Sequence, residues 1–360
     1  MKAFRLVPAL LVLVTVSACE GDRPAPMAPG PSMEARQPSP EMLDRYLVEY
    51  SGDVAKLAAA VKAAGGDVGR IHDNIGVLEV EGMAAGDIMA LPGVQHATPD
   101  AVFHGLPIAI MGYRLDDAPF TPSPMPADAY FFDCQWDLQQ IRAEEAWAAG
   151  ARGAGQKIAL LDTGVDEDHV DLVGRIDLAQ SVNLVTWHDG ACPEEDATTR
   201  TDYNSHGTGN AAEIASNNIG VAGLLPDGQT VNIKVATCTG DGSLADFLAG
   251  LLYAADLDDV SVLSISLYYP VKRGEPGSKR YIAMMQKAVD YVTQQGKLII
   301  GTAANDGINL STLKDSVYIP TTLANVRSAY ATNHLDQLAP YSNYGVSGTW
   351  VGGPGGQDWE

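Results

Sequence analysis

The sequence predicts an α/β fold, a mainly parallel sheet flanked by helices, preceded by a smaller α+β domain. Two observations support this prediction. From residue 128 onward, short apolar runs alternate with stretches of helical periodicity, which is typical of a buried parallel sheet with crossover helices. Between residues 41 and 104, shorter elements follow in the order β-α-β-β-α-β. A chain of 360 residues is long enough for both parts.

The composition is that of a globular, acidic chain. Hydrophobic residues make up 46% and charged residues 19% of the sequence, which are ordinary values for a folded protein. The formal net charge is −22 at pH 7, and no cluster of lysine and arginine is present. Because phosphate binding needs such a cluster, we expect no nucleic-acid partner.

The first residues predict export. Two basic residues precede an apolar run of 11 residues, 6–16, which is followed by Ser-Ala-Cys19. Such a run is too short to span a membrane and is typical of a secretory signal. The letters VSAC resemble the lipobox of bacterial lipoproteins, which implies removal of residues 1–18, a lipid on Cys19, and a membrane-anchored or secreted extracytoplasmic protein. The alternative is an ordinary signal with an incidental cysteine.

Residues 19–40 are rich in proline and predict an extended tether. The segment 41–104 then contains the alternating strand RYLVEY and the helix VAKLAAAVKAAGG, which ends in glycines. Two further strands, DVGRIH and GVLEVEG, a helix AAGDIMALPG and a final strand VQHATPDAVF complete a ferredoxin-like order. Residues 105–127 include five prolines and predict an exposed connector where processing is expected.

Residues 128–360 carry the elements of the main sheet. The apolar runs are short enough for strands, and the amphipathic stretches are long enough for helices. The predicted strands are KIALLD (157–162), VNIKVA (231–236), VSVLSISL (260–267) and KLIIGTAA (297–304), and the predicted helices are SLADFLAGLLYAAD (243–256) and YIAMMQKAVDYVTQQG (281–296).

Three polar residues lie where predicted strands stop or a helix begins. Asp162 ends KIALLD, His206 precedes the helical run AAEIAS, and Asn305 follows IIGTAA. A carboxylate can orient an imidazole, the imidazole can take a proton from a hydroxyl, and an amide can donate to a developing oxyanion. Each residue alone also fits a plainer role as a helix cap, a core histidine or a turn former. Together, at the carboxyl ends of strands, they predict a catalytic site.

The motifs around these residues resemble the subtilisin-like serine proteases, peptidase family S8. The resemblance runs from about residue 136 to 354 and implies a subtilisin-like sheet that cleaves protein or peptide substrates. It implies that Asp162 orients the imidazole, that His206 is the general base and that Asn305 stabilises the oxyanion. The matching motifs are ALLDTGVDEDHVDL, NSHGTGNAAEIAS, IIGTAANDG, NNIGVAG, VLSISL and YSNYG.

The segment 41–104 resembles the inhibitory propeptides, of the inhibitor I9 type, that precede such proteases. The similarity includes the ending LPGV…PD at residues 91–100. It implies that the chain's own propeptide is a partner of the protease domain, as intramolecular inhibitor and chaperone. An independent small binding domain would have the same order of elements.

Two other hydrolase classes fit the sequence less well. The letters DTG also occur in aspartic proteases, but those need two carboxylates that share a proton, and this chain has a single DTG in an α/β context. A zinc hydrolase is disfavoured because no HExxH is present. We expect no cofactor for the chemistry. Asp171 resembles a calcium ligand of the family, although the companion loop SNNIGVAG is shorter than usual.

The sequence departs from the family pattern near the substrate. The resemblance assigns Ser266, Leu267 and Tyr268 to substrate binding, on a strand that usually ends Ser-Leu-Gly-Gly and here reads SLYY. Since extended peptides pair with such a strand edge, the two tyrosines are expected to crowd or reshape the pocket. The histidine motif continues with Gly-Asn-Ala-Ala at 209–212 in place of the usual residues, which is expected to alter helix packing beside His206.

No nucleophilic serine is identified in this chain. The family's Gly-Thr-Ser motif follows the oxyanion asparagine by roughly 65 residues, whereas only 55 residues (360 − 305) follow Asn305 here. Ser342 and Ser347 precede the strand end WVGGPGG and are on the wrong side of it. We therefore expect a protease truncated before its serine and inactive as written. The alternative is a pseudo-protease that serves as a peptide-binding or decoy module.

Three cysteines remain if Cys19 carries a lipid. Cysteines tend to pair outside the cytoplasm. Cys134, Cys192 and Cys238 allow three pairings, and we favour Cys192 with Cys238 because both lie in polar, loop-like sequence.

Overall fold

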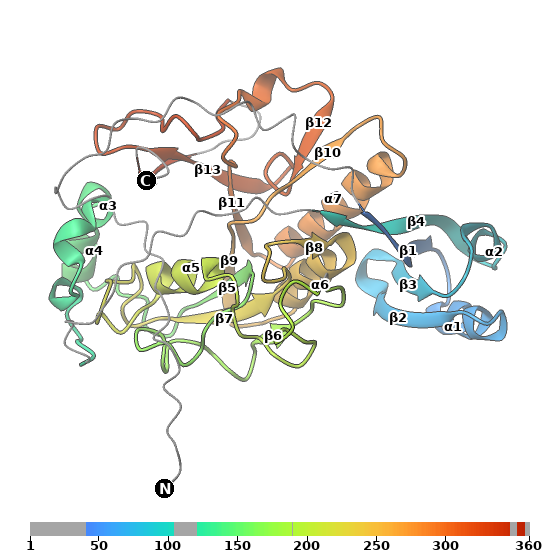
Figure 1. The fold of residues 1–360 in the computed structure, drawn as a ribbon, viewed down its shortest axis with the longest axis horizontal. Helices are drawn as coiled ribbons and strands as arrows, with labels where there is room; N and C mark the ends of the chain where they lie inside the picture. The colour runs from blue at the N-terminus through green and yellow to red at the C-terminus, as the bar shows by residue number, and fades with distance from the viewer. Residues whose placement is uncertain (1–40, 104–120, 189, 346–350, 357–360) are drawn as a thin grey trace, which may run out of the picture.

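Two α/β units make up the computed structural model, which describes residues 41–103, 121–188, 190–345 and 351–356 (Figure 1). The predictions for the signal, Cys19 and the tether, and most of the predicted connector, lie outside the described residues. None of the described helices is both long and apolar enough to cross a membrane.

The N-terminal unit has the predicted β-α-β-β-α-β order. Its antiparallel strands lie side by side in the order β2-β3-β1-β4. Asp53 caps the first helix by accepting hydrogen bonds from the amides of Ala55 and Lys56, which would otherwise lack partners. The elements are β1 (Glu41–Tyr50), α1 (Val54–Ala63), β2 (Asp67–His72), η2 (Asp73–Ile75), β3 (Val77–Glu81), α2 (Ala85–Met89) and β4 (Val94–Phe103).

The larger unit is built on a sheet in which all paired strands are parallel, in the order β14-β13-β11-β9-β5-β7-β6. This confirms the predicted fold class. The strands are β5 (Lys157–Asp162), β6 (Val182–Asn183), β7 (Gln229–Lys234), β9 (Val260–Ile265), β11 (Leu298–Thr302), β13 (Val326–Thr332) and β14 (Val351–Pro354).

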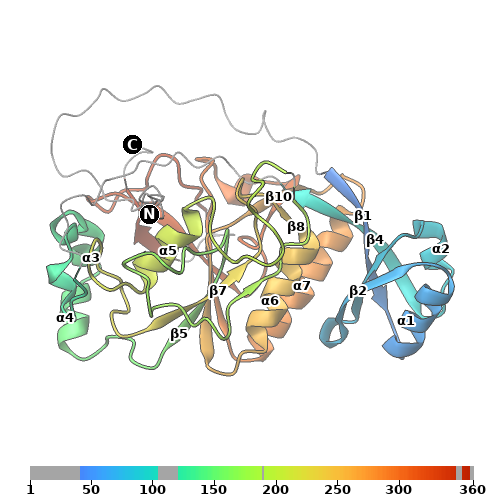
Figure 2. The same cartoon turned by 60° about the horizontal axis from the view of Figure 1, so that its bottom comes forward.

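Helices cover both faces of this sheet. On one face, α6 (Leu244–Ala255) and α7 (Ser278–Gln294) lie side by side, and their apolar residues share a core with β5, β7, β9 and β11 (Figure 2). On the other face, α5 (His206–Ile214) packs through Ala211 and Ala212 against Leu160 of β5. The remaining elements are η3 (Pro126–Asp128), η4 (Phe132–Cys134), α3 (Trp136–Gln140), α4 (Ala143–Ala148), β8 (Gly242–Ser243), β10 (Tyr269–Lys272), η5 (Leu310–Thr312) and β12 (Ser316–Ile319).

The N-terminal sheet packs on α6 and α7, with its own helices on the far side (Figures 1 and 2). Its last strand, β4, also pairs with β8 of the larger unit, where Val102 lies opposite Ser243 and Phe103 opposite Gly242. The two units therefore share both a sheet edge and a hydrophobic core.

A buried charged network crosses the same interface. Arg45 of β1 donates to Asp100 at 2.9 and 2.5 Å and to the hydroxyl of Ser243 at 3.1 Å. Arg70 of β2 donates to Asp246 of α6 at 2.7 Å. Asp100 also accepts from the amide of Ala245 at the start of α6. Because breaking a buried charged pair leaves an uncompensated charge, these contacts fix how the units dock.

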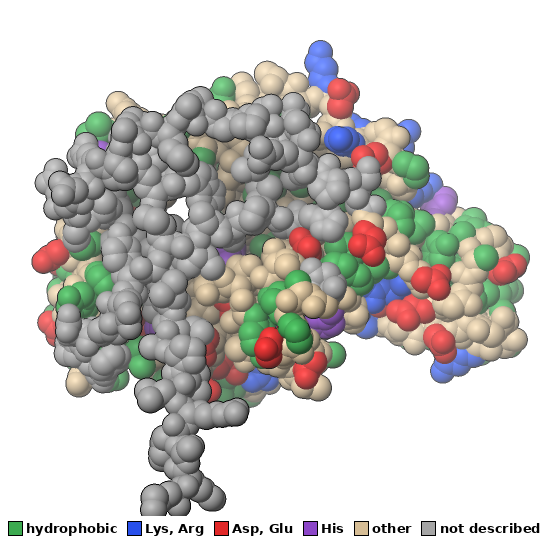
Figure 3. Space-filling model, viewed as in Figure 1, with side chains coloured by type: hydrophobic (Ala, Val, Ile, Leu, Met, Phe, Trp, Pro, Cys, Tyr) green, Lys and Arg blue, Asp and Glu red, His purple; other side chains and the backbone are tan. Residues whose placement is uncertain are grey.

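Charge on the visible surface agrees with the acidic composition. In Figure 3, acidic side chains are scattered over the described residues of that face, and basic side chains there do not form a continuous patch.

Candidate active site

Asp162 and His206 meet at the carboxyl edge of the sheet. Asp162 is the last residue of β5 and is fully buried, and His206 is the first residue of α5. The imidazole Nδ1 lies 2.6 Å from Oδ1 of Asp162. Because an ionised carboxylate only accepts, Nδ1 carries the proton. The other ring nitrogen, Nε2, is left as the base, on a side chain that is 18% exposed.

Hydrogen bonds from backbone and hydroxyl groups hold Asp162 and His206 in place. Oδ1 of Asp162 also accepts from the amide of Thr163 at 2.7 Å and from its hydroxyl at 3.2 Å. The single proton of this hydroxyl is shared with Asp202, whose Oδ1 is nearer at 2.9 Å, and the hydroxyl oxygen accepts from the amide of Gly207. Asp202 in turn accepts from the amide and hydroxyl of Thr208. The first turn of α5 is thus tied to the end of β5.

Gly207 allows this close approach. A Cβ at this position would lie 2.0 Å from the carbonyl oxygen of Gly164 and 3.0 Å from Oδ1 of Asp162, and the first of these separations is impossible for non-bonded atoms. Only glycine lets the start of α5 contact the strand end so closely.

Asn210 adds a donor that the sequence did not indicate. It lies one turn after His206 on α5, where residues four apart share a face. Its amide nitrogen donates to Oδ2 of Asp162 at 2.9 Å and lies 3.4 Å from both ring nitrogens of His206.

The pKa values of the pair move apart. Burial opposes ionisation of Asp162, but the charge and hydrogen bond of His206, with donors from Thr163 and Asn210, outweigh it and hold the pKa of the carboxyl below its usual value. Burial also opposes the charge of His206, but Asp162 outweighs it and raises the pKa of the imidazole. The carboxylate therefore stays charged while the imidazole can gain and lose a proton, as a general base must.

A buried lysine supports the end of β5. Lys234, the last residue of β7, is fully buried; its ammonium donates to the carbonyl oxygens of Thr163 and Ala236. It lies 2.7 Å from Oε1 of Glu195, which is itself buried. The other oxygen of Glu195 accepts from the amide of Cys238. A disulfide joins Cys192 to Cys238, which confirms the predicted pairing.

Asn305 lies at the same edge of the sheet, two strands away from Asp162. It follows β11, which is separated from β5 by β9, a spacing of about 10 Å between strand axes. Among the described residues, none forms a hydrogen bond with the Asn305 side chain, which is half-buried. The loop after it is held by Asn343, whose side chain accepts from the amides of Asp306 and Ile308. The Asn305 amide is therefore positioned but free to donate.

A residue with left-handed backbone conformation directly precedes His206, and another directly precedes Asn305. Ser205 has φ +80° just before His206, and Ala304 has φ +75° just before Asn305. This region costs a residue with a Cβ about 1–2 kcal/mol, and such strain is found at sites where direction of a side chain matters.

The predicted substrate-binding residues follow β9, which ends at Ile265 and so is two residues shorter than predicted. Ser266 is half-buried, and Leu267 belongs to the main core. The ring of Tyr268 stacks on that of Tyr318 with centroids 5.8 Å apart. Its hydroxyl is buried without a hydrogen-bond partner in the described structure; it faces the backbone of Asn305, but short of hydrogen-bond geometry.

Of Tyr268 and Tyr269, only Tyr268 lies on the side of Asn305. The expectation that both would crowd the pocket is wrong, because neighbouring residues of an extended chain point to opposite faces. Tyr269 is directed into the interface with the N-terminal unit, where its ring lies 5.2 Å from Phe103 and 5.4 Å from Phe247.

Asp171 does not fit the calcium site that the resemblance suggested. Its carboxylate is fully buried and accepts hydrogen bonds from the amides of Ile219, Gly220 and Val221. These amides take the place that a cation would fill. Within the described parts of the chain, no group of three or more histidine, cysteine or acidic side chains could hold a metal ion.

The described serines do not complete the site. None of them forms a hydrogen bond with His206. Ser342 is buried, donates to the carbonyl of Asn343 and accepts from the amide of Ala331, so it has a structural role. Ser347 lies outside the described residues.

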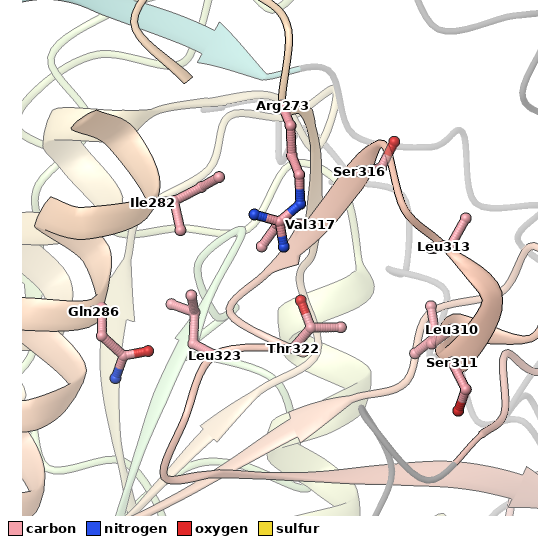
Figure 4. Close-up of a pocket in the computed structure, with 10 residues that line it drawn as sticks. All are labelled: Arg273, Ile282, Gln286, Leu310, Ser311, Leu313, Ser316, Val317, Thr322 and Leu323. Carbon is pink, nitrogen blue, oxygen red and sulfur yellow. The ribbon is translucent and has the colours of Figure 1, made fainter. Parts of the chain in front are cut away.

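A surface pocket lies away from these residues. This pocket has a volume of about 270 Å³ and lies between α7, η5 and the β10–β12 ribbon. Arg273 and Leu323 point into it (Figure 4). Val317 lines it, whereas the next residue, Tyr318, stacks on Tyr268. The pocket is therefore on the opposite face of β12 and includes none of the predicted site residues.

Comparison with known proteins agrees with this architecture. The Subtilase family profile matches residues 153–355. The "Thermophilic serine proteinase" of Bacillus sp. (strain AK1) is 28% identical over 82% of this chain and 64% of its own length. "Thermitase" of Thermoactinomyces vulgaris is 30% identical over 63% of this chain and 74% of its own. The chain thus spans less than two thirds of the first of these relatives.

Solved structures share the fold. The epidermin leader peptide processing serine protease of Staphylococcus aureus superposes with a TM-score of 0.68 and 21% identity, over 86% of this chain and 74% of its own. The nisin leader peptidase of Lactococcus lactis has a TM-score of 0.54 and 20% identity, over 62% and 68%. The profile match covers more than half of the sequence, including Asp162, His206 and Asn305. The chain therefore belongs to the subtilase family.

Proposed function

We propose that this chain is part of a serine endopeptidase in which Asp162 and His206 form the acid–base pair. The observation that carries the proposal is the 2.6 Å contact between His206 Nδ1 and a fully buried carboxylate. It leaves Nε2 as the base at the edge of the sheet where Asn305 offers an unused amide.

The proposed reaction uses these groups in turn. Nε2 of His206 takes the proton of a serine hydroxyl as its oxygen attacks the peptide carbonyl, and Asp162 stabilises the imidazolium that forms. The Asn305 amide donates to the oxyanion of the tetrahedral intermediate. The imidazolium then gives its proton to the departing amine, and water repeats the sequence to release the acid. No step requires a cofactor.

We propose that the nucleophile follows the strand β14. In that arrangement Val351–Pro354 leads into the serine motif, as the resemblance of WVGGPGG to the strand before that motif suggests. This chain alone would then bind peptides weakly and hydrolyse almost none.

Tyr268 supports a preference for small residues at the attacked bond. Its ring, stacked on Tyr318, faces the backbone of Asn305, so it fills space beside the carbonyl that Asn305 would bind. A substrate residue with a large side chain would have to displace this stacked pair. Ser266 and Leu267 would contribute backbone groups to the same site, since the Leu267 side chain is in the core.

The N-terminal unit is proposed to act as an intramolecular inhibitor and chaperone. Its strand β4 ends by pairing with β8, and its last described residue, Phe103, packs on Tyr269 next to the substrate-binding stretch. The shared core and the buried Arg45–Asp100 pair would make release slow unless the connector is cut.

Export and lipid anchoring at Cys19 remain part of the proposal. A diacylated cysteine would hold the protein on a membrane surface by burying its acyl chains, at about 0.8 kcal/mol per CH₂. Mass spectrometry of the membrane fraction should find the lipid on Cys19, and Cys19→Ala should release the protein.

The decisive experiment begins with the DNA past the codon for Glu360. The product that includes the downstream sequence should hydrolyse a fluorogenic peptide and react with a fluorophosphonate, and His206→Ala should abolish both. A downstream sequence without a serine motif, together with peptide binding but no hydrolysis, would overturn the proposal and favour a pseudo-protease. The retained Asp162–His206 geometry argues against that alternative, because peptide binding does not need it.

A further inference from the structure

Oδ2 of the buried Asp162 carboxylate has a single donor. Oδ1 accepts from His206 and from the amide and hydroxyl of Thr163. Oδ2 accepts only from the amide nitrogen of Asn210, at 2.9 Å, as far as the described residues go. Because Asp162 is fully buried, no water can replace this donor without a rearrangement.

The same amide group faces the imidazole. Its nitrogen lies 3.4 Å from both Nδ1 and Nε2 of His206, so it is equally close to the two ring nitrogens. An ionised carboxylate can only accept, which orients the amide with its nitrogen, the positive end of its dipole, toward both Asp162 and the ring. The contact therefore stabilises the carboxylate and opposes charge on the imidazole.

We propose that Asn210 is a positioning residue of the acid–base pair. It holds Oδ2, so that the carboxylate cannot rotate and Oδ1 stays in line with Nδ1 of His206, and it keeps the imidazole neutral at lower pH than Asp162 alone would allow. Its meaning for catalysis rests on the proposed function, but its effect on His206 does not require any hydrolysis.

Three acidic side chains act on His206, and a substitution of Asn210 leaves all three in the protein. They are Asp162 at the end of β5, Asp202 in the loop before α5 and Glu213 on α5 itself. All of them favour the charged imidazole. Asn210 is the neutral group that opposes them, so its removal should change the titration of His206 in a known direction.

The test is an NMR titration of the ¹⁵N-histidine-labelled chain, with His206 assigned by its absence in His206→Ala. Asn210→Ala should raise the pKa of His206 by about 0.5 and speed exchange of the Nδ1 proton, because the opposing dipole and the clamp are both lost. Asn210→Asp keeps the size of the side chain but replaces the donor with an acceptor. It should raise the pKa by about 1 or more.

Asn232→Ala is the control, since Asn232 is a fully buried asparagine of the same unit whose amide nitrogen donates, from β7, to the Glu167 carboxylate and the Arg200 carbonyl and not to Asp162 or His206. It should lower thermal stability and leave the His206 titration unchanged. A His206 pKa that is the same in Asn210→Ala, Asn210→Asp and the parent would overturn the inference. Failure of the serine-bearing product to cleave peptides would overturn the proposed function instead, so the two results are separable.

Discussion

The two ends of the proposed site differ in how their polar groups are satisfied. Asp162 accepts from Thr163, His206 and Asn210, whereas the side chain of Asn305 has no hydrogen-bond partner in the described structure. Yet the backbone around Asn305 is well held, by Asn343. The acid–base pair is therefore complete before substrate binds, while the oxyanion donor is positioned but unpaired until a carbonyl arrives. Electrostatic preorganisation for catalysis needs both conditions.

The largest expected effect comes from removing the base. In the serine-bearing product, His206→Ala should lower kcat by about 10⁴- to 10⁶-fold, because no other described group can take the proton of the hydroxyl. Asp162→Asn should cost about 10⁴-fold. Steady-state hydrolysis of a peptide anilide checks both. Hydrolysis at the parent rate in His206→Ala would show that the end of the site formed by Asp162 and His206, called the closed end below, is not the catalytic one.

The closed end should also be the more fragile one. Lys234→Met would leave Glu195 charged and buried without its cation, and should destabilise the fold by about 3–5 kcal/mol. Urea denaturation followed by circular dichroism measures this. Lys56→Met removes a lysine whose side chain is 85% exposed and pairs with Asp53, and should change the free energy of unfolding by less than about 1 kcal/mol. Equal effects of the two variants would contradict the structural role of Lys234.

At the other end of the site, formed by Asn305, we expect a loss of activity without a loss of stability. Asn305→Ala should lower kcat by about 10²- to 10³-fold and leave the free energy of unfolding nearly unchanged, since no described group loses a partner. Asn343→Ala should cost about 1–3 kcal/mol of stability, because two amides, of Asp306 and Ile308, lose their acceptor. An Asn305→Ala variant that unfolds easily but keeps its kcat would reverse the assignment.

Tyr268 tests the proposed substrate preference. Tyr268→Gly should raise kcat/KM for substrates with a large residue before the cleaved bond, relative to alanine, by about 10- to 200-fold, because the space beside Asn305 is opened. Tyr269→Phe changes the neighbouring tyrosine, whose side chain points away from Asn305, and should leave the preference unchanged. A ratio that stays the same in Tyr268→Gly would place the substrate side chain elsewhere.

The smallest expected effect is a shift in pH dependence. His206 must be neutral to act as base, and its pKa is raised above the ordinary 6.5, since Asp162 outweighs burial. The rate kcat/KM should therefore rise with pH with a midpoint above 6.5. The raised pKa also adds stability that is fully present below pH 6.5 and is lost as the pH rises through the folded value. A midpoint below 6.5 would mean that burial dominates.

The sequence was sufficient for the elements that depend on periodicity and local motifs. Asp162 and His206 were placed at a strand end and a helix start, and the structure brings them together there. The six elements of the N-terminal unit also follow the predicted order. These features depend on residues close in sequence, so a linear pattern records them.

Features that depend on side-chain direction or distant contacts were missed. Asn210 was read as a change in helix packing, because only its direction on α5 brings it to Asp162. Lys234 was read as part of an apolar strand, and its partner Glu195 is 39 residues away (234 − 195). The resemblance of Asp171 to a calcium ligand did not indicate that its carboxylate accepts hydrogen bonds from three backbone amides. The lysine in the predicted buried strand VNIKVA was the one sequence signal of a buried ion pair.

The Cys192–Cys238 bond closes a covalent ring whose ends are 46 positions apart, and His206, Asn210 and Lys234 all belong to the enclosed segment. Protein made in a reducing compartment would lack this disulfide. The segment that carries His206 would then have to pack against β5 without the covalent constraint. Batches from different expression hosts could then share a sequence and differ in the fraction of competent molecules, so the redox history of a preparation should be recorded beside its specific activity.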